Sequence, residues 1–176
     1  MATPIRIDID AGAITASINR LLQLTGPRGL EKVQVEIGDA LVDSTRERFV
    51  TSTAPDGTRW APNTQATYLA YLRKSGKVTL KIGQLNKRGT ALAQSKKPLI
   101  GKSKVLSMDI YPAIEDGALV IGSPMVYAAM QHFGGSKAQF PKLWGDIPAR
   151  PFLGLSDDDE RDILDILGRH LADAAP

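Results

Sequence analysis

The side chains best suited to chemistry in this chain are two histidines, and they lie far apart in the sequence. His132 and His170 would need further ligands to hold zinc, but the chain has no cysteine, and no carboxylate lies at a helical ligand spacing from His132. His170 lies near the end of a predicted helix, where the helix dipole favours an imidazole. We therefore expect both histidines to be structural, with a partner contact as the alternative for His132, and we expect no metal and no cofactor.

Two other motifs resemble ligand sites but depart from them. Gly101-Lys102-Ser103 matches the end of a phosphate-binding loop, yet the glycine required five residues earlier is Lys96. The acids at 157–160 could attract a divalent cation, but their spacing is not that of a calcium loop. No serine lies in a Gly-x-Ser-x-Gly elbow. The sequence therefore predicts no enzyme.

Positive charge is concentrated in one part of the chain. Between Gly57 and Met108 there are eleven Lys or Arg and no Asp or Glu, whereas the rest of the chain carries a net charge of −8. Such asymmetry indicates contact with phosphates or with an acidic face of another subunit, the alternative being a solvated loop. Because the aromatic residues precede the lysines rather than alternate with them, any DNA contact is expected to be with the backbone alone. The candidate residues in the predicted basic loop 73–104 are Arg73, Lys74, Lys77, Lys81, Lys87, Arg88, Lys96, Lys97, Lys102 and Lys104.

A second candidate site is the segment 146–162, "DIPARPFLGLSDDDERD". Two prolines fix the backbone on both sides of Arg150, so little entropy is lost when the segment docks. The guanidinium can pair with a carboxylate, and the Phe-Leu that follows can fill an apolar groove of its own subunit or of a neighbour. In one interpretation this segment and the acidic turn contact the basic face of a neighbouring subunit; in the other it is an edge strand of its own sheet. The residues of that predicted interface are Arg150, Pro151, Phe152, Leu153, Asp157, Asp158 and Asp159.

The same acids also suit the start of a helix. Ser156 is followed three residues later by Asp159, which is the spacing of a capping box. Acidic residues in a first turn interact favourably with the helix dipole. This local explanation stands beside the interface interpretation.

Periodicity predicts the elements that position these residues. Alternation at 4–10 indicates a strand, and helical spacing indicates a helix over 11–24. Gly26-Pro27 breaks that helix, and a long amphipathic helix follows from about 28 to 52, in which Gly38 is unfavourable.

The second half of the chain is predicted to form a hairpin and two helices. Runs at 105–114 and 118–123 are typical of strands joined by an Asp-Gly turn. A helix is expected over 123–135, capped by Ser123 and ended by two glycines. The last helix begins at Ser156, and its expected buried face comprises Ile163, Leu164, Ile166, Leu167 and Leu171.

These elements predict an α+β fold over a single domain, 1–176. We expect an antiparallel sheet packed by the long amphipathic helix and the C-terminal helix, with a long basic loop at 73–104. No apolar run approaches the roughly 18 residues that span a bilayer. The start "MATPIRIDID" is not typical of a secretory signal, so a soluble, cytoplasmic product without membrane contact is expected.

Three blocks in this order resemble one known family. They are "RERFVTSTAPDGTRWAPNTQATY" at 46–68, "LSMDIYPAIEDGALVIGSPMVYAAMQHFGG" at 106–135 and "IPARPFLGLSDDDERDILDIL" at 147–167. Together they resemble the phage virion morphogenesis family, the tail-completion or neck proteins of Mu-like and related tailed phages. The resemblance covers most of residues 28–171.

The resemblance implies a structural, non-enzymatic virion protein at the head–tail junction, present in the host cytoplasm during assembly. It implies an α+β subunit in a homo-oligomeric ring, commonly a hexamer, through which DNA passes. The implied partners are neck, connector or tail-tube proteins, with non-specific DNA contact. The alternative hypothesis is a sequence-independent nucleic-acid-binding module.

Overall fold

The computed structural model describes residues 12–64, 67–68, 71–72, 91, 95–101, 103–143 and 145–174. The predicted strand at 4–10 lies outside the described residues. So do seven of the predicted basic residues, namely Arg73, Lys74, Lys77, Lys81, Lys87, Arg88 and Lys102.

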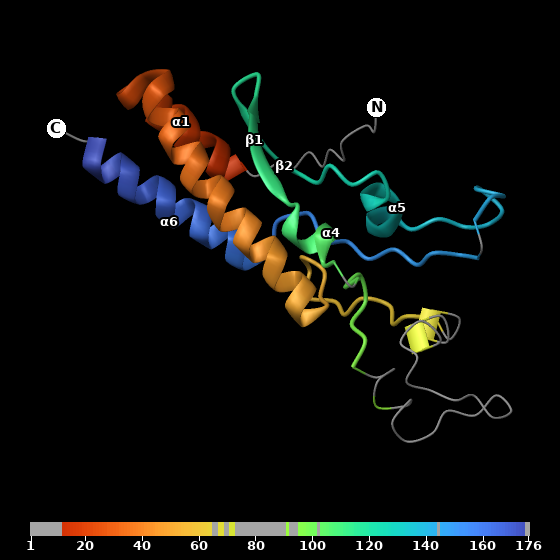
Figure 1. The fold of residues 1–176 in the computed structure, drawn as a ribbon. Helices are drawn as coiled ribbons and strands as arrows, with labels where there is room; N and C mark the ends of the chain where they lie inside the picture. The colour runs from red at the N-terminus through yellow and green to blue at the C-terminus, as the bar shows by residue number, and fades with distance from the viewer. Residues whose placement is uncertain are drawn as a thin grey trace, which may run out of the picture.

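Helix α1 (Gly12–Thr51) consists of two segments that meet at Gly26. Gly26 has φ 68° and ψ −175°, a left-handed φ that glycine adopts without strain, and Pro27 then opens the second segment. Leu21 of the first segment is buried with Val33 and Ile37 of the second, so the chain folds back on itself at Gly26 (Figure 1). The predicted break is confirmed.

Helix α6 (Asp157–Ala174) runs antiparallel along the second segment of α1 (Figure 1). Ile163, Ile166 and Leu167 are buried against that segment, as the helical spacing predicts. Leu164, which was expected on the buried face, is instead 37% exposed. Leu164 lies at the edge of the apolar face of α6, beyond the part of that face that α1 covers.

Strands β1 (Tyr111–Glu115) and β2 (Ala118–Gly122) form the antiparallel hairpin that the Asp-Gly signal predicts. Asp116 and Gly117 have φ of 52° and 81°, the positive values that a two-residue hairpin turn requires. The hairpin packs on α1, and Gln34 Nε2 donates to the Gly117 carbonyl at 2.7 Å. The α+β fold, with its sheet and C-terminal helix packed on a long helix, is confirmed.

Two predicted elements are wrong at their N-terminal ends. Residues 105–108 form a helical turn, α4 (Val105–Met108), because Leu106 and Ile110 are buried at a spacing of four rather than two. Helix α5 (Ala128–Phe133) begins five residues later than expected. Ser123 Oγ accepts from the N–H of Met125 at 3.4 Å, two residues on, which makes a local turn instead of a helix cap. None of the described helices is long and apolar enough to cross a membrane.

Gly38 in α1 lets the hairpin approach the helix backbone. A Cβ at this position would lie 2.8 Å from Cβ of Pro112, and 3.3 Å from a methyl carbon of Leu119. We expect Gly38→Ala to lower the free energy of unfolding by on the order of 1 kcal/mol, since overpacking outweighs the better helix propensity of alanine.

Gly168 in α6 is the matched control, because a Cβ added there would meet nothing within 4 Å. Gly168→Ala should raise the free energy of unfolding by about 0.5–1 kcal/mol. Urea unfolding of the two variants measures both effects. Equal stabilisation at the two positions would contradict the close approach of the hairpin.

Candidate functional site

The candidate site is the strap, which we define as residues 147–156. It is irregular chain apart from one bridge between Ile147 and Gly135, so the prediction of an edge strand is wrong. The N–H of Arg150 donates to the Gln131 carbonyl at 3.0 Å, which ties the strap to α5. Because the strap makes few backbone hydrogen bonds, side chains from other elements hold it.

Arg48 of α1 fixes the end of the strap. Its Nη1 donates to the carbonyls of Phe152 at 3.0 Å and Gly154 at 2.9 Å, and its Nη2 donates to Asp159 of α6. Burial lowers the pKa of Arg48, and the Asp159 carboxylate opposes that shift. The arginine therefore joins three separate segments through one buried charge.

Sequence reasoning did not identify Arg48 as important. A signal was available, because Arg48 lies seven residues after Leu41 and so falls on the inward stripe of the amphipathic helix. A charge on such a stripe requires a buried partner.

Asp159 has two roles at the start of α6. Its Oδ2 accepts from the N–H of Ser156 at 2.7 Å, and its own N–H donates to Ser156 Oγ at 3.2 Å. The predicted capping box is thus confirmed. The same carboxylate receives Arg48, so it is enclosed within its own subunit.

Arg150 points inward and is buried. Its Nε donates to the Ala61 carbonyl at 2.8 Å, and its Nη2 donates to the Pro62 carbonyl at 2.9 Å. The sequence predicted a carboxylate partner, but two carbonyls of its own chain take that place. Burial lowers the pKa of Arg150. Trp60 adds a parallel tie, since its Nε1 donates to the Pro151 carbonyl at 2.7 Å.

The apolar pair of the strap fills a groove of its own subunit. Phe152 and Leu153 are buried, and the Phe152 ring lies 5.3 Å from the ring of Phe49. Phe49 in turn meets Trp60 edge-on at 5.3 Å. This aromatic group forms the centre of the core around the end of α1.

His132 of α5 accepts hydrogen bonds from the strap. The N–H groups of Phe152 and Leu153 lie 3.3 and 3.4 Å from its Nδ1. Burial lowers the pKa of His132 to about 4, so the imidazole is neutral and accepts at Nδ1 at neutral pH. This geometry fits the structural role that the sequence favoured.

These contacts reduce the number of residues that remain available for the predicted subunit interface. Arg150, Phe152, Leu153 and Asp159 have their side chains buried in their own subunit, and Pro151 is half-buried. Asp157 and Asp158 are exposed. A subunit contact here stays a prediction, and the two exposed acids are the residues that can make it while the strap remains in place.

The described part of the basic loop lies beside the strap. Lys96 is half-buried, with its Nζ 5.6 Å from the centre of the Tyr71 ring, and burial lowers its pKa. Lys97 and Lys104 are exposed. Lys97 Nζ donates to the Val50 carbonyl at 2.5 Å, where a cation is favoured by the helix dipole of α1.

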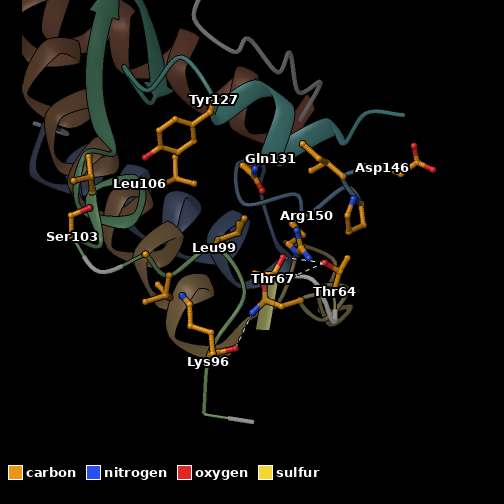
Figure 2. A pocket seen from close by; sticks show the side chains of 16 residues that line it. Thr64, Thr67, Lys96, Leu99, Ser103, Leu106, Tyr127, Gln131, Asp146 and Arg150 are labelled. Carbon is orange, nitrogen blue, oxygen red and sulfur yellow. Dashed lines mark hydrogen bonds between the residues drawn. The ribbon is translucent and has the colours of Figure 1, made fainter. Parts of the chain in front are cut away.

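A cavity of about 330 Å³ opens between the strap and this loop. Figure 2 shows Arg150, Thr64 and Thr67 on one wall, and Leu106 and Tyr127 on the opposite wall. The two threonine hydroxyls are 3.0 Å apart and bond to each other. The described lining contains no nucleophile paired with a base, and the described residues contain no group of three acids or histidines placed to hold a metal ion.

Replacing Arg48 should be strongly destabilising. We expect Arg48→Met to lower the free energy of unfolding by about 3–5 kcal/mol, because it strands the Asp159 carboxylate in the interior. Arg161→Met is the matched control, since it breaks the exposed pair with Asp158 and should cost less than about 1 kcal/mol. Similar losses from the two variants in urea unfolding would contradict the central role of Arg48.

The buried histidine should make stability depend on pH. The folded pKa of His132 is about 4 and its ordinary value is 6.5, so the unfolded chain binds more protons and stability falls as the pH drops from about 6.5 towards 4. Between about pH 7.5 and 5 the loss from this group is about 2 kcal/mol.

His132→Asn keeps an acceptor but does not titrate, so it isolates this effect. The variant should lose less stability than the parent over the same interval, while other titrating groups contribute equally to both chains. If the free energies of unfolding of the two proteins fell by equal amounts over this pH interval, the assignment of the pH dependence to His132 would be contradicted.

Comparison with known proteins identifies one family over most of the chain. The model of the phage virion morphogenesis family matches residues 9–172. Among relatives, the putative capsid assembly protein G of Escherichia phage Mu is 27% identical over 174 residues, which cover 99% of this chain and 98% of the relative. No solved structure matches. The resemblance is confirmed, and the chain belongs to the phage virion morphogenesis family.

Proposed function

We propose that this protein is a structural component of the head–tail junction of a phage virion, where it forms a ring through which DNA passes. The observation that carries the proposal is the family match over residues 9–172. The family supports a role in virion assembly, and the Mu relative is named as a capsid assembly protein. The junction and the ring are the further steps that we propose.

The site geometry supports a role without catalysis. The charged side chains of the site are buried and hydrogen-bonded within the subunit, namely those of Arg48, Arg150 and Asp159. His132 has its Nδ1 directed at two backbone N–H groups rather than at a cavity. These side chains hold the strap, so the chemistry that the sequence offers is used for structure.

The charge distribution supports a ring around DNA. A closed ring repeats each subunit's charges by rotation, so cations of the window between Gly57 and Met108 would recur once per subunit around it. Those of them that face the lumen would hold DNA through its phosphates, without reading sequence. The same window supports the second candidate function, a sequence-independent nucleic-acid-binding module.

Assembly in lysates tests the proposal. A phage with a null allele of this gene should yield heads and tails that remain separate in electron micrographs. Added purified protein should restore infectious particles in proportion to the amount supplied, saturating at a fixed number of copies per particle. That stoichiometry distinguishes a structural part from an enzyme, which would act at far lower amounts.

Two outcomes would contradict the proposal. Joined, infectious particles from the null allele would show that the junction does not need this protein. Strong salt-dependent DNA binding by the free protein, without rescue of particle assembly, would favour the nucleic-acid-binding module instead.

A further inference from the structure

A shallow hollow of about 610 Å³ lies where the end of α1 meets α4. Its apolar lining is in part open to solvent, since Val50 is 56% exposed and Met108 is 62% exposed. The described lining contains three cations and no acid; Arg46 already pairs with Asp43 beside the lining, Lys97 donates to the Val50 carbonyl, and Lys104 is exposed. We call this surface the hollow, and its lining includes Arg46, Val50, Lys97, Ile100, Lys104 and Met108.

The hollow combines cations with apolar side chains, and this combination determines which kind of partner fits it. A DNA backbone would neutralise the cations but leave Val50 and Met108 in water. A protein segment with carboxylates around an apolar side chain would contact both the cations and the apolar side chains of the lining. The occupant that fits is therefore an acidic, amphipathic surface rather than a phosphate chain.

The exposed face of α6 has this composition. Leu164 is 37% exposed, and Glu160 lies one turn before it on the same side of the helix. Asp157 lies on that side as well, seven residues before Leu164, and both acids are exposed. This face thus presents one large apolar side chain next to unburied carboxylates, with the exposed Arg161, which pairs with Asp158, beside them.

The two surfaces lie on opposite sides of the end of α1. Arg46 and Val50 are one turn apart on the side that faces the hollow. Arg48 is about 200° around the helix from Arg46 and points to Asp159 at the start of α6. In Figure 1, α4 and α6 accordingly flank the lower end of α1.

Complementary patches on opposite sides of a subunit cannot meet within one chain, but they can meet head to tail between copies. Such a heterologous contact generates a ring when its rotation closes. We propose that the exposed face of α6 docks into the hollow of the next copy, with Leu164 against Val50 and Met108 and Glu160 among the cations. This contact rests on the proposed ring and names the surfaces that would build it.

Charge reversal on each surface tests the contact. Lys104→Glu with Met108→Glu places acids in the hollow, and Glu160→Lys with Leu164→Lys places bases on α6. The native mass of each double variant at low salt should fall from that of the ring to that of the 19.0 kDa subunit. All four substitutions in one chain should restore the ring, because the swapped charges are again complementary.

Two control variants carry similar changes elsewhere. The controls are Leu24→Glu and Asp173→Lys. Leu24 is 48% exposed near the other end of the molecule, and Asp173 lies in the last turn of α6. Both should keep the native mass of the parent, and circular dichroism should show every variant folded. Persistent rings in the double variants, or no recovery in the combined variant, would overturn the contact.

The outcomes separate this contact from the proposed function. A parent chain that stays monomeric at low salt overturns the contact. Rescue of particle assembly in lysates then still decides whether the protein acts at the junction. A parent ring that survives both reversals leaves the ring in place but built from other surfaces.

Discussion

The buried guanidinium of Arg48 is the interaction on which the rest of this structure depends. It bonds two carbonyls of the strap and the Asp159 carboxylate, so α1, the strap and α6 meet at one charge. A buried charge is costly unless every lone pair and proton around it is satisfied. That requirement fixes the register of α6 along α1 more sharply than apolar packing alone, because sliding by one residue would break the pair.

The strap is a chain segment that lies in the core with a single β-bridge, at Ile147, and no other strand pairing. Its carbonyls and N–H groups must still be satisfied, and side chains from other elements do much of this. Arg48 and Trp60 donate to strap carbonyls, whereas His132 accepts from strap N–H groups. Arg150 reaches back from the strap to the segment after Trp60. The strap and the Trp60 segment therefore hold each other in place around the aromatic core.

Local signals in the sequence were sufficient for much of this fold. The break at Gly26, the Asp-Gly hairpin turn and the capping box of Ser156 each depend on residues within a few positions, and each is confirmed. The helical turn α4 was predicted as strand because a short apolar run fits either period. The partners of Arg48 and Arg150 were not predictable, since they lie about a hundred residues away in one case and nearly ninety in the other. The resemblance gave the family, but it assigned no contact to any side chain.

The side chains of the strap bond within the subunit, and this limits which surfaces are free to contact a neighbour. The strap residues that sequence reasoning assigned to an interface are already used to complete the subunit. Among the residues that the structure describes, no buried side-chain nitrogen or oxygen lacks a hydrogen-bond partner, so these groups need no neighbouring subunit to satisfy them. Any contact with a neighbour would then come from exposed charges and scattered apolar side chains, which give moderate, salt-dependent affinity. Because such contacts strengthen as the ionic strength falls, association between copies of a subunit built in this way should depend on the salt concentration.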